Sequence, residues 1–334
     1  MRLSLVLLAI PTLVAAQAEP TITEWNVPWG QTRPRDPAVG ADGRIWFAGQ
    51  VGNYIGVLDP KTGSFKRYDI DDGTLPHNVV IGPDGAAWYA GNANGIIGRL
   101  DPATGNIKRF PMPEADLTDP HTLIFDQGGN LWFTLQGSNA VGHLDPRSGK
   151  VRIVRVPEKG SRPYGIVLDE KQHPWFVEFG ANRIGTIDPA TFKLTEYTIP
   201  DPSARPRRVA LGGDGRIYAG DYSRGKLVAL DPKTGKFTEY QNPAGSRSAP
   251  YAMTSDNLGR IWQVETGVHP NRFVVFDPKT ETFGTPVPVT PSGGIVVRHM
   301  VFDPKTRTIW FGTDANTIGR VALGPASAER ALTP

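Results

Sequence analysis

The apolar residues of this chain fall in short runs, and polar turn residues separate each run from the next. Within residues 75–119, the runs HNVVI (77–81), AAWYA (86–90), IIGRL (96–100) and NIKRFP (106–111) are separated by glycine, proline, asparagine and aspartate. Short apolar runs bounded in this way predict β-strands joined by tight turns. No stretch shows the sustained i, i+3, i+4, i+7 apolar spacing of a long helix, so an all-β fold is predicted.

An aromatic residue recurs in these units at a nearly constant distance. The series is Trp46, Trp88, Trp132, Trp175, Tyr218, Trp262 and Trp310, with spacings of 42, 44, 43, 43, 44 and 48 residues. A period in the low forties, built from four short strands, is typical of one propeller blade. We therefore predict a seven-bladed β-propeller with four-stranded blades, formed by residues 19–324. The aromatic rings are expected to pack between neighbouring blades.

The turn after the third predicted strand of a blade has the repeated sequence DP-x-[TS]. It begins at Asp59, Asp101, Asp145, Asp188, Asp231 and Asp277. The seventh unit has no such turn at this point and therefore lacks a fourth strand of its own. Residues 21–28 (TITEWNVP) resemble the fourth-strand sequences at 194–200 (LTEYTIP) and 237–242 (FTEYQN). We expect this N-terminal strand to pair with the last blade and close the ring, which leaves no open sheet edge.

The two ends of the chain are expected to lie outside the propeller. Residues 1–18 have the pattern of a signal peptide, in which Arg2 precedes an apolar run and Ala16-Gln17-Ala18 fits a cleavage site. The apolar run is too short for a permanent membrane anchor, and a chain without cysteine has no disulfide. We expect an exported monomer, periplasmic or extracellular, with residues 325–334 as a C-terminal tail.

The charge of the chain is close to balance. It has 36 Lys and Arg residues against 33 Asp and Glu residues, a formal net charge of +3, and no run of five or six like charges. This distribution argues against nucleic acid as a partner. The expected partner is a small-molecule ligand or substrate.

Eleven positions before each recurring aromatic stands a residue that usually follows proline. The first strand of a blade lines the central channel, so these residues should form a ring at one mouth of the channel. They are Arg35, His77, His121, Tyr164, Arg207, Tyr251 and His299. None is apolar, which makes this ring the candidate site. His121 and His299 are candidate catalytic bases because histidine titrates near neutral pH, and the other five are candidate ligand-binding residues.

A second ring is predicted at the end of each second strand, fourteen positions after the first ring. It consists of Gly49, Gly91, Leu135, Glu178, Asp221, Glu265 and Thr313. A hairpin returns its second strand beside the start of its first, so this ring should lie next to the first. Glu178 and Glu265 are candidate ligands for Mg²⁺, which prefers oxygen donors, and Asp221 is a candidate ligand-binding residue. Alternatively, these acids pair with arginines such as Arg207 and Arg208 across a water-filled channel.

The blade sequences at 163–200 and 76–105 resemble those of virginiamycin B lyase and its streptogramin lyase relatives. The shared elements are Pro-[His/Tyr]-x-[Ile/Val], Trp-Phe-x-Glu and Asn-x-Ile-Gly-x-[Leu/Ile]-Asp-Pro, and the resemblance covers residues 21–323. It implies a seven-bladed propeller. For the lyases themselves it also implies magnesium-assisted opening of a depsipeptide ring by β-elimination at its ester linkage.

The catalytic residues implied by the resemblance are mostly not matched. The family pattern has histidines at the post-proline position of the last two blades. One glutamate stands two residues before the second histidine and another fourteen after it. The corresponding residues here are Tyr251, His299, Val297 and Thr313, with Asp314 adjacent. Because His299 alone fits, a site built for a different ligand is expected.

Two functions remain open at this point. The first is a metal-assisted carbon–oxygen lyase that acts on a small ester or lactone-containing molecule at the channel mouth. The second is a non-catalytic binding module for a peptide or a small anionic or sugar-like ligand. Tyrosine and arginine side chains around the mouth suit such ligands. Stimulation by a metal would favour the lyase, and saturable binding without turnover would favour the binding module.

Overall fold

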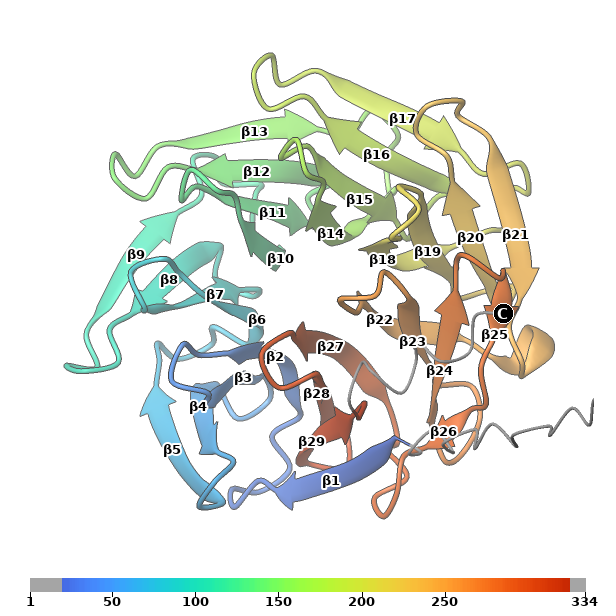
Figure 1. Ribbon diagram of the computed structural model, residues 1–334. Coiled ribbons are helices and arrows are strands. Elements are labelled where there is room, and N and C mark those ends of the chain that lie inside the picture. The colour runs from blue at the N-terminus through green and yellow to red at the C-terminus, as the bar shows by residue number, and fades with distance from the viewer. Residues whose placement is uncertain (1–19, 325–334) are drawn as a thin grey trace, which may run out of the picture.

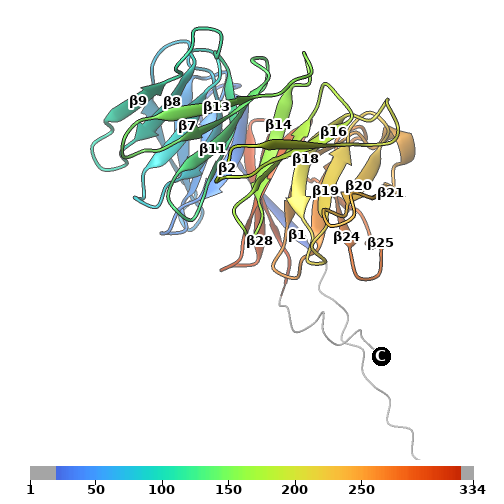
Figure 2. The ribbon, with the colours of Figure 1, turned by 90° about the horizontal axis from the view of Figure 1, so that it is seen from above.

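The computed structural model describes residues 20–324, which form seven β-sheets arranged in a ring around a central axis (Figure 1). Figure 2 shows the same ring turned by 90°. The predicted all-β, seven-bladed propeller is confirmed. The predicted signal peptide at 1–18 and the tail at 325–334 lie outside the described residues.

The first and second strands of the blades form the inner half of the ring. The first strands are β2 (Pro34–Val39), β6 (Pro76–Ile81), β10 (Pro120–Phe125), β14 (Pro163–Leu168), β18 (Pro206–Leu211), β22 (Pro250–Ser255) and β27 (Val297–Asp303). The second strands are β3 (Ile45–Gly49), β7 (Ala87–Gly91), β11 (Leu131–Leu135), β15 (Pro174–Glu178), β19 (Ile217–Asp221), β23 (Ile261–Glu265) and β28 (Thr308–Thr313). We call the side of the ring where the first strands begin the start face, and the side where they end the end face.

The third and fourth strands complete the blades toward the outside. The third strands are β4 (Tyr54–Asp59), β8 (Ile96–Leu100), β12 (Ala140–Leu144), β16 (Arg183–Ile187), β20 (Lys226–Leu230), β24 (Arg272–Asp277) and β29 (Thr317–Ala322). The fourth are β5 (Ser64–Asp69), β9 (Ile107–Pro111), β13 (Val151–Arg155), β17 (Leu194–Thr198), β21 (Phe237–Gln241), the pair β25 (Thr282–Phe283) and β26 (Val287–Pro288), and β1 (Thr21–Asn26). The described chain has one 3₁₀ turn, η1 (Gly245–Arg247), and contains no helix long and apolar enough to cross a membrane.

The N-terminal strand closes the ring as predicted. β1 pairs antiparallel with β29 over its whole length, from Thr21 opposite Ala322 to Asn26 opposite Thr317. Trp25 of β1 stacks on Trp310 of β28 with ring centroids 5.6 Å apart. A strand from the start of the chain therefore supplies the fourth strand that the last blade lacks, and both the backbone pairing and the ring packing are preserved.

The repeated Trp-Phe and Ile-Gly elements pack against each other within and between blades. In blade three, Trp132 is 1% exposed and contacts the blade-four turn through Phe192, at a centroid distance of 5.4 Å. Phe133, on the opposite side of the strand, lies over Gly142 of the neighbouring strand β12, where a Cβ would come within 2.2 Å of the Phe133 ring. The third-strand glycine is therefore required because the second-strand ring occupies the place of its side chain.

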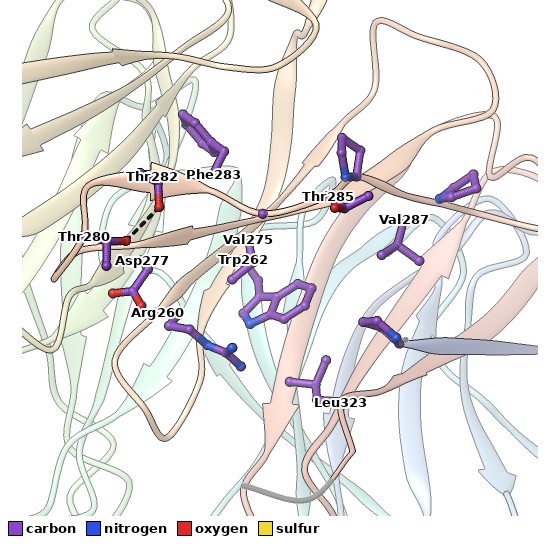
Figure 3. A pocket seen from close by; sticks show the side chains of 14 residues that line it. Arg260, Trp262, Val275, Asp277, Thr280, Thr282, Phe283, Thr285, Val287 and Leu323 are labelled. Atoms are coloured by element: carbon purple, nitrogen blue, oxygen red, sulfur yellow. Dashed lines mark hydrogen bonds between the residues drawn. The ribbon is translucent and has the colours of Figure 1, made fainter. Parts of the chain in front are cut away.

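Blade six departs from the repeat in its outer strand. In blade one, Tyr68 of β5 stacks on Trp46 at 5.6 Å, whereas the equivalent register position in blade six holds Val287. The outer strand is interrupted between Phe283 and Val287. A surface pocket of about 410 Å³ remains beside Trp262, and Phe283, Val287 and Leu323 form part of its lining (Figure 3).

Candidate ligand site in the central channel

Each first strand begins with a β-bulge that turns two successive side chains toward the channel. The register of every first and second strand pair shifts within three or four residues of the strand start. A bulge places two residues opposite one on the partner strand, so strict alternation is broken there. The channel is consequently lined at the start face by two polar layers and not by the single ring that was predicted.

The first layer is a packed plug and not an open mouth. Tyr164 and Tyr251, from blades four and six, form a hydrogen bond between their hydroxyls at 2.5 Å. The Arg207 guanidinium lies over the Tyr251 ring at 3.6 Å and also contacts the rings of Tyr222 and Phe179 at 4.5 and 4.6 Å. Cation–π contacts of this kind hold an arginine in place without neutralising its charge.

Two predicted site histidines also belong to this layer. The rings of His77 and His121 face each other with centroids 3.5 Å apart, and His121 lies 4.1 Å from the Tyr164 ring. His121 Nδ1 is 2.8 Å from the hydroxyl of Thr122. The structure therefore brings His77, His121, Tyr164, Arg207 and Tyr251 together as the sequence predicted.

The second layer is organised around one buried carboxylate, Asp36. It accepts hydrogen bonds from Arg35 Nε at 3.0 Å, from Arg208 Nη2 at 3.2 Å and from Asn78 Nδ2 at 3.2 Å. Arg208 also donates from Nη1 to Thr122 Oγ1 at 3.1 Å. These bonds join blades one, two, three and five across the channel.

Arg208 reaches the channel axis because blade four leaves room for it. Gly165 stands at the second-layer position of blade four, and a Cβ there would lie 3.3 Å from Arg208 Cδ and 3.0 Å from Arg208 Cα. Distances this short require the neighbouring chain to shift. Glycine at this position therefore allows the arginine to cross the second layer.

The cluster has more hydrogen-bond donors than acceptors. Three buried arginine donors make no hydrogen bond to any described residue: Arg35 Nη2, Arg207 Nε and Arg208 Nε. The ring nitrogens His77 Nδ1, His121 Nε2 and His299 Nδ1 are also without a partner there, and each is a donor or an acceptor according to the tautomer of its ring. The three arginines carry three positive charges, and Asp36 is the single carboxylate hydrogen-bonded to any of them in the cluster. Buried polar groups are normally paired, so this surplus indicates that the site accepts an electron-rich ligand.

The protonation states follow from burial and from the arginines. Burial lowers the pKa of His77 and His121 well below the usual value, and nearby arginines lower both further. Burial and Arg208 lower the pKa of His299 to about 3. These histidines are neutral at pH 7 and add no positive charge. Burial alone would raise the pKa of Asp36, but Arg35 and Arg208 hold it well below its usual range, so Asp36 is ionised.

Tyr251 is the one group of the plug whose pKa approaches neutrality. Burial acts to raise the pKa, but Arg35, Arg207 and Arg208 together lower it to about 8. For Tyr164, burial and the neighbouring Tyr251 raise the pKa. Tyr251 is therefore the hydroxyl of the pair that ionises, and once it does, Tyr164 donates the hydrogen bond to the phenolate oxygen.

His299 occupies a different position from the one predicted. In blades one to six the residue opposite the end of the second strand is the proline, as in Pro250 opposite Glu265. In blade seven this place is taken by Val297, opposite Thr313. The residue in the first layer is therefore Arg298, which pairs with Asp314 at 2.8 Å, and His299 lies one position further along the strand. The eleven-residue spacing misplaced it because the turn between β27 and β28 is one residue longer.

The acids of the predicted second ring are held within their own blades. Asp221 pairs with Arg224 at 2.5 Å and accepts a hydrogen bond from the Arg205 backbone N–H. Glu265 pairs with Arg272 at 2.5 Å and accepts from the Ala244 N–H at 2.8 Å. Asp221 and Glu265 thus pair with arginines, as the alternative interpretation had it, but with arginines of their own blades and not with those of the channel.

Glu178 is buried beside a second carboxylate. Neither of its carboxyl oxygens has a hydrogen-bond donor among the described residues. Burial and the neighbouring Glu196 raise the pKa of Glu178 to about 8. At pH 7 this glutamate is therefore mostly protonated.

The donor set does not fit the expected divalent cation. Residues 20–324 contain no group of three or more His, Asp or Glu side chains placed to hold a metal ion. In the channel itself, the carboxylate of Asp36 already accepts from two arginines. Mg²⁺ prefers several oxygen ligands, and guanidinium groups repel it.

A hollow opens from the polar layers toward the end face. It has a volume of about 390 Å³, and its inner end is formed by Thr122, Arg208 and His299. Its wall is largely apolar and includes Val80, Ile124, Val167, Leu168, Leu211, Met253 and Val301. The open part of the channel is thus on the opposite side from the predicted mouth.

Sequence reasoning missed Asp36, Asn78, Thr122 and Arg298 as members of the channel cluster, and it named Arg208 only as an alternative partner of the second-ring acids. The second layer consists of the residue directly after the first-layer position of each blade: Asp36, Asn78, Thr122, Gly165, Arg208, Ala252 and His299. One signal in the sequence could have shown this layer. In four blades the residue directly after the first-layer residue has a charged or hydrogen-bonding side chain, namely Asp36, Asn78, Thr122 and Arg208. A strict two-residue alternation would point these side chains away from the channel.

The fold and the channel define a seven-bladed β-propeller that encloses a buried cluster of charged and polar side chains. The chain belongs to the virginiamycin B lyase family, whose family model matches residues 15–230. Comparison with curated proteins gave no match.

Solved structures of this family resemble the chain over nearly its whole length. Selenomethionine-substituted virginiamycin B lyase from Staphylococcus aureus shares 26% identity and a TM-score of 0.82, covering 91% of this chain and 99% of that one. A catalytically inactive histidine-to-alanine variant of the Staphylococcus aureus enzyme, solved with quinupristin, gives the same identity, TM-score and coverage. Hydrazine synthase from Kuenenia stuttgartiensis shares 13% identity with a TM-score of 0.73, covering 89% of this chain and 97% of that one, and shows the fold alone.

Proposed function

We propose that this protein is a non-catalytic module that binds a small anion-bearing molecule in its central channel. The observation that carries the proposal is the surplus of buried donors around Arg35 and Arg208, which share the single carboxylate of Asp36. A ligand carboxylate or phosphate would accept from the unpartnered Arg208 Nε. Charge-assisted hydrogen bonds of this kind are among the strongest in proteins.

The positions implied by the lyase resemblance support binding over lyase chemistry. In register, the first-layer residues of the last two blades are Tyr251 and Arg298. Val296 stands two positions before Arg298, and Thr313 at the end of the second strand shares a hydrogen bond with Thr317. None of these four positions holds a histidine or a glutamate.

The test is calorimetric titration of the purified protein with acetate, phosphate and the uncharged acetamide as a control. The anions are expected to bind and acetamide is not. Arg208→Met removes the guanidinium donors but keeps an unbranched side chain that reaches to the position of Nε, and should weaken anion binding by roughly ten- to a hundredfold. The same substitution at Arg147, whose side chain is 82% exposed, should leave the affinity unchanged. Equal affinities in all three proteins would contradict the proposal.

A carbon–oxygen lyase is the second candidate, and it rests on Tyr251. The Tyr251 hydroxyl is hydrogen-bonded to Tyr164, and three nearby arginines stabilise its phenolate form. As a phenolate, Tyr251 could remove a proton from a carbon atom of a bound substrate. A screen of ester- and lactone-containing compounds for elimination products tests this candidate, with Tyr251→Phe as the inactive control. Turnover that survives Tyr251→Phe would remove it.

Export of the protein is part of the proposal and rests on the apolar run at 3–14 followed by Ala16-Gln17-Ala18. The check is the N-terminal sequence of the protein recovered from the source cells. A chain that begins at Glu19 is expected, and a chain that retains residues 1–18 would contradict export.

A further inference from the structure

We infer that the ligand is a carboxylate with an aliphatic chain, which enters from the end face with its charged group toward Arg208. The inference rests on the proposed function and specifies its ligand. The lining of the channel changes along its axis, from polar layers at the start face to an apolar wall at the end face.

The inner end of the hollow provides the site for the anionic group. Arg208 is 1% exposed, lines the hollow and has an unpartnered Nε. Thr122, which is 3% exposed, lies beside it and already accepts from Arg208 Nη1. His299 lines the same end with an unpartnered Nδ1. A carboxylate bound here would accept a hydrogen bond from Arg208 Nε, and the positive charge of Arg208 lies at this end of the hollow.

The wall provides the site for the chain. Val80, Ile124, Val167, Leu168 and Val301 are half-buried, and they face the hollow at the ends of the first strands. Thr254 and Ser255 are the hydroxyl-bearing residues of this wall, and no charged residue other than Arg208 lines the hollow. Apolar surface lining a cavity with few polar groups is typical of a site for an apolar ligand segment. Each methylene group transferred from water to such a wall adds to the affinity.

The direction of entry follows from the plug. At the start face, the Tyr164–Tyr251 hydrogen bond and the stacked Arg207 close the channel. The hollow is lined by residues at the ends of the first strands, up to Leu168, Leu211 and Ser255. The ligand therefore reaches Arg208 from the end face. Its aliphatic chain then lies along the apolar wall, with the far end of the chain toward solvent.

The test is a series of straight-chain carboxylates, from acetate through butanoate and hexanoate to decanoate, titrated into the full-length protein. Affinity is expected to rise about three- to fourfold per added methylene, until the chain extends beyond the wall. Arg208→Met should weaken every member of the series, while Val167→Thr, which keeps the side-chain shape, should reduce the gain per methylene. Decanol, which lacks the charge, should bind much more weakly than decanoate.

The outcomes separate this inference from the proposed function. If acetate and decanoate bind equally and both depend on Arg208, the anion site stands and the aliphatic ligand is overturned. If no carboxylate binds, the anion site and this inference both fail. Decanoate binding that is unchanged by Arg208→Met would overturn the assigned orientation.

The face of entry is tested by single cysteines, since the chain has none. Ser255→Cys places a thiol on the wall of the hollow, and Val51→Cys places one on the start face, at a residue that is 55% exposed. Labelling with a bulky maleimide should abolish decanoate binding in the Ser255→Cys protein and leave it intact in the Val51→Cys protein. The reverse result would overturn entry from the end face.

Discussion

The first and second strands of each blade repeat with the same period, yet they use that period differently. In the second strands, Trp132 and its equivalents bury an aromatic ring in all seven blades. A second ring, such as Phe133, lies over a third-strand glycine in five blades, whereas blades five and six hold Ala219 and Gln263 at that position. In the first strands, the bulged positions hold Arg35, Asp36 and Arg208 along with histidines and tyrosines, and several donors are left unpartnered. The recurring aromatic packing therefore stabilises the ring, and the charged and polar variation is concentrated where a ligand can use it.

The largest effect is expected from the packing strands. Trp132→Ala should lower the free energy of unfolding by about 3–5 kcal/mol, because it removes a 1% exposed ring from the contact between blades three and four. Urea denaturation followed by circular dichroism measures this loss. Trp132→Phe keeps an aromatic ring and should cost clearly less. A loss below about 1 kcal/mol in the alanine variant would show that the Trp132 ring does not stabilise the contact between blades three and four.

The next effect concerns the channel strands and has two opposite parts. Asp36→Asn removes the carboxylate shared by Arg35 and Arg208, and leaving two buried cations uncompensated should cost about 3 kcal/mol of stability. Anion affinity should increase at the same time, because the positive charge of the site is no longer offset. Denaturation and calorimetric titration measure the two parts. A variant that is destabilised but binds acetate more weakly would contradict the role given to Asp36.

These two strands also differ in how well the sequence predicts them. The period, the turns and the closing strand follow from local patterns, so the seven blades could be predicted in number and order. Side-chain direction at the bulges could not, because a bulge breaks the two-residue alternation of a strand. At Asp36 the backbone also adopts a positive φ of 47°. The spacing from Trp310 placed His299 in the first layer because a single extra residue in a turn moves the register by one.

The acids of the second strands were misjudged for a related reason. Their position at the ends of β15, β19 and β23 was correct, but position does not give direction. Arg224 and Arg272, three and seven residues further along the chain, draw Asp221 and Glu265 into local ion pairs. Both arginines are visible in the sequence. Their short distances to the acids in the folded protein are needed to show that they, and not the channel arginines, are the partners of Asp221 and Glu265.

The third prediction compares two glutamates at equivalent second-strand ends. The folded-state pKa of Glu178 is raised from 4.5 to about 8 by burial and by Glu196, so the folded protein binds this proton more tightly than the unfolded chain does. Stability is then fully present below about pH 4.5 and is lost progressively up to about pH 8. Glu178→Gln, which stays neutral, should be more stable than the parent at pH 7, by roughly 2–3 kcal/mol.

The matched control is Glu265→Gln, which should have the opposite sign. It removes the charge that pairs with Arg272 and accepts from the Ala244 N–H, so it should destabilise the protein at pH 7. Thermal unfolding of both variants between pH 5 and pH 8 measures the difference. Equal pH profiles for the parent and Glu178→Gln would show that Glu178 does not hold its proton.

The smallest effect is expected from the tyrosine pair, and it reports on the channel without the need for a ligand. Because Arg35, Arg207 and Arg208 lower the pKa of Tyr251 to about 8, phenolate absorbance should show one tyrosine that titrates well before the others. Tyr251→Phe should abolish this early step, while Tyr222→Phe, which alters another ring stacked on Arg207, should retain it. The loss of one buried hydrogen bond should cost only about 1 kcal/mol. If the early titration step persists in the Tyr251→Phe protein, another tyrosine ionises first. The three arginines would then not lower the pKa of Tyr251 as described.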